Sequence, residues 1–293
     1  MSEKRDLTAV ILLVVLALIW GTSFILIKKG LMSFSPDEVA SLRVASAALF
    51  VLPVALTRLK GLTGRDYSKL LLSGLIGIFI PSFLFSFAQT RLDSSIAGVM
   101  NSLTPIWTMI IGAALFSQRF RGIAIVGTIV GFTGTVVLIL TNADGISGQF
   151  NAYALLVILA TVLYGSNLNL IKFKIEHISS LTITTVSVML IGPPALIYLL
   201  GFTEFLPKLS AVPGAWRSFG FVVILGLMST AVATVVFNKL VKTNSPLFAS
   251  SVTYLIPIVA VMWGVIDGEH LLTGHYIGMI LIIGGVYLAN RKR

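Results

Sequence analysis

Three polar side chains and a proline lie in the middle of one long apolar stretch, and they are well placed to do chemistry. The stretch is 97–116, AGVMNSLTPIWTMIIGAALF, and it carries Asn101, Thr104, Pro105 and Thr108. Spacings of four and three residues place Asn101, Pro105 and Thr108 on one face of a helix. Such polar groups either contact a polar ligand or bond between helices, at roughly 1 kcal/mol or less each. Asn101 and Thr104 are candidate binding residues, whereas packing is favoured for Thr108.

A second stretch repeats this arrangement. Residues 249–266, ASSVTYLIPIVAVMWGVI, have Thr253 where the first stretch has Asn101, and Pro257 where it has Pro105. Proline removes a backbone donor, which frees the carbonyl one turn earlier, near Asn101 and Thr253. We predict that Thr253 and Asn101 face one shared cavity. Pro105 and Pro257 are predicted to be kink or gating positions.

Aromatic and polar side chains lie together in two further apolar stretches. Trp20 and Ser23 belong to the sequence WGTS, and Tyr164 and Asn167 belong to the sequence YGSN. Trp20 is about thirteen residues inside its apolar run, which is deeper than an interfacial aromatic belt would place it. Its indole either stacks on an apolar or aromatic ligand or packs in the core, and Tyr164 has the same two interpretations. These four residues are candidates for a binding site, together with Tyr254.

The composition indicates that the surroundings of this chain are mainly lipid. Of its 293 residues, 56% are hydrophobic and only 11% are charged, and the mean hydropathy is +0.98. A soluble chain has roughly 25% charged residues. The net charge of +10 does not indicate nucleic-acid binding, because the basic residues lie at the ends of apolar runs rather than in one patch. The absence of cysteine excludes disulfides and thiolate chemistry.

Ten apolar runs are long enough to be membrane helices of about 20 residues. They are 7–28, 37–57, 69–90, 94–116, 122–141, 152–172, 180–201, 217–238, 245–266 and 274–290. With the N-terminus in the cytoplasm, fifteen of the 21 Lys and Arg residues fall on the cytoplasmic side and five on the other. This bias predicts a multi-pass protein with both termini in the cytoplasm.

Arg43 is the charge that lies deepest within these expected helices. It is about one turn inside 37–57, and Glu38 precedes it by five residues. Its long side chain either extends to the membrane surface or binds a carboxylate on a ligand. Arg43 is therefore a further candidate binding residue.

The chain has the features of a duplicated unit. The sequences WGTS and YGSN are offset by 144 residues, and Gly127 and Gly134 correspond to Gly278 and Gly285. The two five-helix copies would be 1–141 and 150–293. Because five is odd, the second copy enters the membrane from the opposite side, which predicts an all-α fold with an inverted repeat.

Small-residue spacing indicates close helix packing in the last helix of each copy. Gly127 and Gly131, and likewise Gly274 and Gly278, are separated by three residues. Such spacing lets helices approach closely. It serves either to bring the two copies together or to form a homodimer interface, and the sequence does not choose between them.

At these landmarks the chain resembles the EamA family of the drug/metabolite transporter superfamily. The family's W-G-[ST]-x-F opening is matched by WGTSF at 20–24, and its arginine followed by small apolar residues is matched by RVASA at 43–47. Pro105 and Pro257 match its two prolines. Its Gly-Glu-Arg signature is incomplete: the first copy has Ser-Gln-Arg at 117–119, and the second has Gly-Glu-His at 268–270. A role that needs the acid and the arginine in both copies is therefore doubtful.

The resemblance implies an inner-membrane carrier that exports a small metabolite, such as an amino acid, by alternating access. A channel-like pore and a membrane partner subunit without transport of its own are the alternatives. No phosphate-binding loop, H-E-x-x-H or G-x-S-x-G sequence is present, so we expect neither an enzyme nor a cofactor.

Acidic residues and histidines are absent from the middle of every expected helix. Glu269, His270 and His275 lie together near one turn, and a solvated turn is favoured there over a metal site. Proton coupling normally needs an acid or a histidine at membrane depth. We therefore expect uniport or exchange, or coupling at Glu269.

Overall fold

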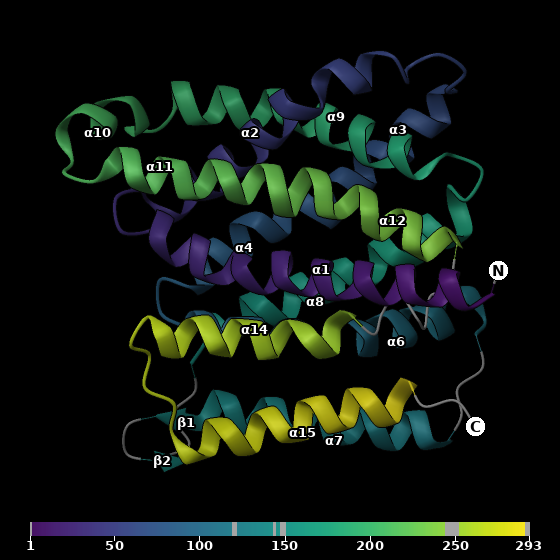
Figure 1. Cartoon of the computed structure of the whole chain (residues 1–293), viewed down its shortest axis with the longest axis vertical. Coiled ribbons are helices and arrows are strands. Elements are labelled where there is room, and N and C mark those ends of the chain that lie inside the picture. Colours follow the sequence, from purple (N-terminus) through teal and green to yellow (C-terminus); the bar gives the residue numbers. More distant parts are fainter. Residues whose placement is uncertain (1, 119–121, 143–144, 147–150, 244–251, 291–293) are drawn as a thin grey trace.

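The computed structural model describes residues 2–118, 122–142, 145–146, 151–243 and 252–290, and nearly all of them are helical. The helices lie side by side in a layered bundle (Figure 1). The first half contains α1 Ser2–Gly30, α2 Pro36–Leu56, α3 Gly64–Gly74, η1 Leu75–Phe79, α4 Ile80–Ala88, α5 Ser94–Met100, η2 Asn101–Leu103, α6 Thr104–Phe116 and α7 Gly122–Leu140. The second contains α8 Tyr153–Lys174, α9 Ser180–Gly201, α10 Phe205–Ala211, α11 Ala215–Ile224, η3 Leu225–Val232, α12 Ala233–Thr243, α14 Val252–Ile266 and α15 Thr273–Asn290.

Strand structure in the described residues is limited to one short antiparallel pair. In it β1, Thr141–Asn142, pairs with β2, Gly145–Ile146.

Seven helical spans in the described part of the chain are long and apolar enough to cross a membrane. They are Ile11–Gly30, Pro36–Leu56, Gly64–Ala88, Ser94–Phe116, Tyr153–Lys174, Ser180–Gly201 and Ala215–Leu240. Three shorter apolar helices follow the remaining expected runs: Gly122–Val137, Leu255–Ile266 and Thr273–Gly285. Residues 245–251, the part of the expected run 245–266 that precedes α14, lie outside the described residues.

The outer surface of the bundle is apolar, as lipid contact requires. On α1 the exposed side chains include Ile11, Val14, Val15 and Leu18, whose spacing of three and four residues marks one helical face. The chain is therefore a multi-pass α-helical membrane protein. The start of α1 and the end of α15 lie at the same end of the bundle (Figure 1).

Three of the long spans are interrupted near their middle. The π-helical segments η1 and η3 lie within the third and the last of these spans, and η2 is a turn of 3₁₀ helix that ends two residues before Pro105. Such irregular turns redirect backbone and side chains, and they are frequent at functional sites.

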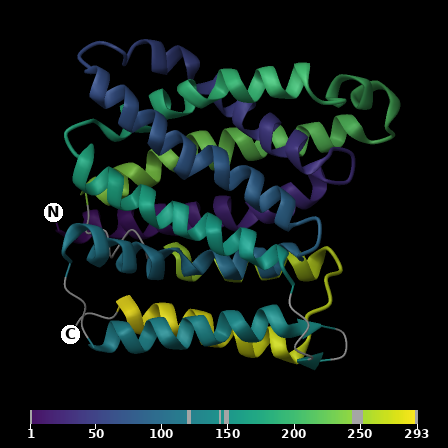
Figure 2. The same cartoon turned by 180° about the vertical axis from the view of Figure 1, so that it is seen from behind.

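The helix α7 packs against α15 with backbone in contact with backbone, and Figure 2 shows this pair as a separate layer of the bundle. A side chain on Gly134 would come within 2.7 Å of the carbonyl oxygen of Gly278, and one on Gly285 would overlap the backbone of Gly127 and Gly131. These glycines thus bring the two halves of one chain together, the first of the two roles expected for them.

Candidate functional site

A central cavity of about 1070 Å³, counting the space that opens to solvent, lies between the two halves of the chain. Its walls come from α1, α2, α4, α6 and α8, from α12 and α14, and from the irregular turns η1, η2 and η3. Its lining combines aromatic rings with a few polar groups, as in many binding sites for small organic solutes.

Most of the residues predicted from the sequence line this cavity. They are Trp20, Ser23, Arg43, Asn101, Thr104, Pro105, Tyr164, Asn167 and Thr253. The side chain of Tyr254 lies outside the described residues. Pro257 lies within α14 and is not among the lining residues. The Thr108 hydroxyl donates to the carbonyl of Thr104 at 2.8 Å and is likewise not a lining residue.

Each half of the chain contributes an aromatic side chain to the cavity wall. Trp20 of α1 packs edge-to-face on Phe237 of α12, with 4.9 Å between ring centroids. Tyr164 of α8 stacks with Phe85 of α4 at 6.0 Å. The Trp20 indole N–H donates to the carbonyl of Ser229 at 3.1 Å, so both a ring contact and a hydrogen bond from the second half set the position of its ring.

Polar side chains in the cavity wall also contact the opposite half of the chain. The hydroxyls of Ser23 and Ser229 are hydrogen bonded to each other, and Asn167 accepts a hydrogen bond of 2.7 Å from Ser73. A side chain on Gly77 would overlap the Asn167 amide, so glycine in η1 is what allows Asn167 to approach. Ser23 and Asn167 both line the cavity while bonding to the opposite half.

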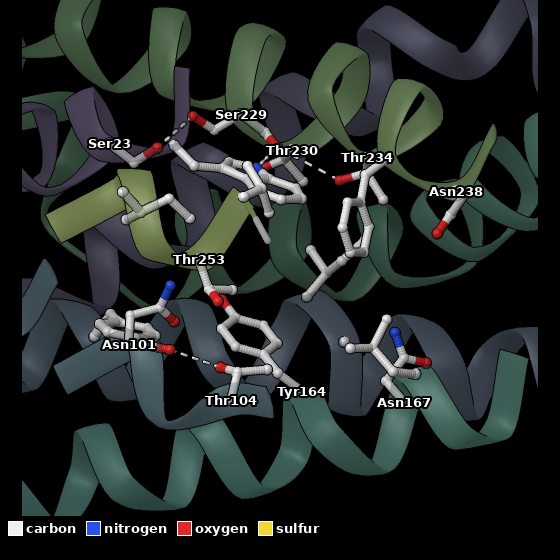
Figure 3. Close-up of a pocket in the computed structure, with 18 of the residues that line it drawn as sticks. Ser23, Asn101, Thr104, Tyr164, Asn167, Ser229, Thr230, Thr234, Asn238 and Thr253 are labelled. Carbon is white, nitrogen blue, oxygen red and sulfur yellow. Dashed lines mark hydrogen bonds between the residues drawn. The ribbon is translucent and has the colours of Figure 1, made fainter. Parts of the chain in front are cut away.

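The interruption before Pro105 determines how Asn101 is presented. Its backbone carbonyl, which Pro105 cannot engage, accepts a hydrogen bond of 2.8 Å from the Thr104 hydroxyl. The Asn101 side-chain oxygen is buried and has no hydrogen-bond partner among the described residues. Figure 3 shows Thr253 above Asn101 and Tyr164, with Ser229 and Thr230 on the opposite wall. Asn101 thus offers the cavity an unused polar group.

Arg43 lines the cavity instead of extending to the membrane surface. Its Nε donates to the Thr230 hydroxyl in η3 at 2.9 Å. Glu38, the nearest acid before it in the sequence, is paired with Lys208 at 2.8 Å. A side chain on Gly226 would come within 2.6 Å of the Arg43 carbonyl oxygen, so η3 lies directly against α2 at this point.

The sequence-based predictions missed part of the lining. Examples are Phe85, Ser229, Thr230, Thr234, Phe237 and Asn238. The adjacent polar pair Ser229 and Thr230, inside the expected helix 217–238, was the available signal. The periodicity of an α-helix could not show which way these two side chains point, because η3 is π-helical.

Glu269 lies at one end of the bundle near the cavity, and the expectation of a solvated turn there is wrong for Glu269 and His275, which are buried, whereas His270 is exposed. Its side chain is only 2% exposed. The carboxylate accepts hydrogen bonds from the backbone N–H groups of Ser94 and Ser95 at 2.9 and 3.0 Å, and from both hydroxyls at 2.6 Å. Gly268, with a φ of +84°, makes the preceding turn, and Gly264 leaves room for the carboxylate.

Lysines at the end of α1 complete what we call the Glu269 cluster: Lys28, Lys29, Ser94, Ser95, Asp267 and Glu269. Lys28 contacts both Glu269 and Asp267 at 2.9 Å, and Lys29 pairs with Asp267. The cluster joins the two halves of the chain directly beside Ile27, which lines the cavity. Within the described residues no group of three His, Asp or Glu side chains could hold a metal ion.

Electrostatics keep the Glu269 carboxylate charged. Burial alone would raise its pKa, but hydrogen bonds from Ser94 and Ser95 and the contact with Lys28 outweigh burial and lower the pKa to about 2. The lysines also lower the pKa of Asp267, through the hydrogen bond from Lys29 above all. The two carboxylates of the cluster are therefore ionised at neutral pH.

These features define a class: a multi-pass membrane protein with a central cavity between two halves and an ion cluster at one end. The EamA-like transporter family matches residues 7–140 and again residues 151–291. The chain belongs to this family and is a membrane transporter.

Relatives and a solved structure agree over nearly the full length. The chain is 27% identical to an uncharacterized transporter of Archaeoglobus fulgidus, over 94% of this chain and 95% of that one. It is 25% identical to the uncharacterized inner membrane transporter YedA of Escherichia coli K12, over 94% and 88%. It is 27% identical to a protein of the same strain named a probable amino-acid metabolite efflux pump, over 98% and 95%. A crystal structure with 18% identity shares the fold, with a TM-score of 0.67 over 96% of both chains.

Proposed function

We propose that this chain is an inner-membrane secondary transporter that exports a small metabolite, such as an amino acid, by alternating access. The observation that carries this proposal is the central cavity lined by both halves, with the Glu269 cluster joining those halves at one end. The name of the relative in Escherichia coli K12, a probable amino-acid metabolite efflux pump, supports the direction and the kind of substrate.

The proposal includes two five-helix copies, 1–141 and 150–293, arranged as an inverted repeat across ten membrane spans. The two separate matches to one family support it. So do the paired contacts in the cavity: Trp20 with Phe237 corresponds to Tyr164 with Phe85. Inverted-repeat carriers bind their substrate near the membrane midplane, between the copies.

The two proposed copies differ in charge at corresponding turns, the turn after α6 in the first copy and the turn after α14 in the second. The backbone N–H of Glu269 donates to the carbonyl of Gly264 at 2.9 Å, and that of Gln118 donates to the carbonyl of Gly112 at 3.2 Å. Gln118 thus occupies in the first copy the place that Glu269 occupies in the second. We assign the conformation described here to a state closed at the Glu269 end, which faces away from the cytoplasm if both termini are cytoplasmic.

The cavity also bears on the driving force. Among the described residues that line it there is no Asp, Glu or His. A proton-coupled site normally has such a group at membrane depth. The proposal is therefore uniport or exchange, driven by the substrate gradient.

Reconstitution tests the proposal. The purified chain in liposomes should show counterflow of at least one small metabolite from a panel of amino acids, nucleosides and sugars. Counterflow requires that a loaded binding site cross between two states, which neither a pore nor a partner subunit can provide. Conductance without counterflow would replace the carrier by a channel, and the absence of both would leave the role of a partner subunit.

A further inference from the structure

The cavity carries a single formal charge. Arg43 is the only charged side chain among the described lining residues, and no acidic side chain lies there to offset it. Cavities lined by one sign of charge concentrate ligands of the opposite sign, and low-dielectric walls strengthen the attraction. The site is therefore electrostatically suited to an anion and lacks the carboxylate that an organic cation would need.

Arg43 differs from other cations within the bundle in what it contacts. Lys28, Lys29 and Lys208 each pair with a carboxylate. Arg43 has no ion pair with the acids in the described part of the chain, and its hydrogen bond goes to the neutral hydroxyl of Thr230. An arginine inside a membrane protein without a countercharge is costly, so such a residue indicates a ligand.

The hydrogen bond to Thr230 leaves the part of Arg43 that recognises carboxylates available. A guanidinium has five N–H donors, of which Nε uses one here. The two Nη groups can form the paired, parallel hydrogen bonds that fit the two oxygens of a carboxylate. Thr230 thus holds Arg43 at Nε, with its guanidinium at the wall of the cavity.

The remaining lining supplies an apolar body and neutral polar groups. Trp20, Phe85 and Phe237 offer aromatic surface, and the Asn101 side-chain oxygen lacks a partner among the described residues. Neutral acceptors of this kind can receive a hydrogen bond from a hydroxyl or an amine, but they do not balance a full positive charge.

We propose that the transported substrate is a small organic monocarboxylate with an apolar or aromatic body, whose carboxylate binds the Nη groups of Arg43, and that an ammonium group is not required. This inference rests on the proposed transport function and deepens it, because it names the part of the substrate that the site recognises. Amino acids belong to the class through their carboxylate.

Three probes that share a phenylethyl group but differ in the charge of the attached group test the preference for an anion. They are 3-phenylpropionate, its neutral amide 3-phenylpropionamide, and the cation phenethylamine, each titrated calorimetrically into the purified full-length chain. The carboxylate should bind, and the amide and the amine should bind at least about tenfold more weakly, because charge-assisted hydrogen bonds are the strong ones. Equal affinity for the amine or the amide, or no binding of the carboxylate, would overturn the inference.

Two substitutions test the residue. Arg43→Gln should weaken 3-phenylpropionate binding about 10- to 100-fold. Arg43→Lys keeps the charge without the planar fork and should give an intermediate loss, which keeps the test decisive if the glutamine variant does not fold. Arg58→Gln is the matched control, because Arg58 is exposed just beyond α2 and should bind the probe like the original chain. Unchanged binding in both Arg43 variants would refute the assignment.

The binding and counterflow experiments together distinguish a failure of the carboxylate site from a failure of the transport function. Arg43-dependent binding of 3-phenylpropionate without counterflow of any solute would refute transport and leave the carboxylate site standing. Counterflow of an uncharged or cationic solute, unaffected by Arg43→Gln, would refute the carboxylate site and leave transport standing.

Discussion

Replacing Glu269 by glutamine should open the end of the bundle that the carboxylate holds closed. The introduced glutamine would keep one acceptor for Ser94, but its amide N–H₂ would face the N–H and hydroxyl donors of Ser95, and Lys28 would lose a charge partner. Lowering the pKa of Glu269 from 4.5 to about 2 corresponds to about 3 kcal/mol of stabilisation of the ionised carboxylate relative to a solvated one, which is the upper limit for its effect on the closed arrangement. Losing that stabilisation should shift the balance between closed and open states by up to about 100-fold, the limit being reached when opening exposes the carboxylate fully to water.

Thiol labelling can measure this shift, because the chain contains no cysteine. A single cysteine introduced as Ser23→Cys would lie in the cavity, and a membrane-impermeant maleimide would be added from the side of the Glu269 end. Adding Glu269→Gln should raise the labelling rate by up to about 100-fold while the closed state still predominates.

Glu204→Gln is the matched control for the labelling experiment, since Glu204 is an exposed acid outside the cluster. It should leave the labelling rate unchanged. A rate within about twofold of the parent for Glu269→Gln would refute the assignment of Glu269 as the residue that closes this end.

Two further predictions concern stability. The difference in melting temperature between the original chain and Glu269→Gln should be constant from about pH 8 to pH 5 and shrink below about pH 4. A carboxyl whose pKa is lowered by folding stabilises the folded chain at pH values above its unfolded pKa, and this stabilisation is lost as the pH falls toward about 2. A difference that grows on acidification would contradict this sign. Gly285→Val should destabilise the chain by roughly 1–3 kcal/mol through overlap with α7. Gly284→Val, where no described atom lies within 4 Å, should be milder in the same thermal denaturation assay, and equal losses would show that the contact is unimportant.

The helices and much of the cavity lining were predictable because membrane depth makes polar residues conspicuous. Asn101 and Thr253 stand out in apolar stretches, and both line the cavity. Apolar lining residues such as Phe85 and Phe237 could not be recognised, since their sequence surroundings resemble any lipid-facing segment. Whether the lining residues bind a substrate stays a prediction.

The Glu269 cluster was missed for a different reason. Its partners Ser94 and Ser95 lie 175 and 174 residues away in the sequence, so the turn around Gly268 looks solvated when it is taken alone. Arg43 shows the same limit: the sequence left its direction open between surface and site, and only the packing of η3 on α2 brings Thr230 to its Nε.

The glycine contact between α7 and α15 has a consequence for motion. A contact made mainly of backbone on backbone has few side-chain rotamers that could rearrange, so we expect it to keep its close packing. If the halves of the chain move relative to each other, this pair acts as a pivot, and the displacement grows with distance from it. A spin-label pair across α7 and α15 should then keep its separation in both states. A pair across α1 and the turn after α14, at the Glu269 cluster, should become wider when that end opens.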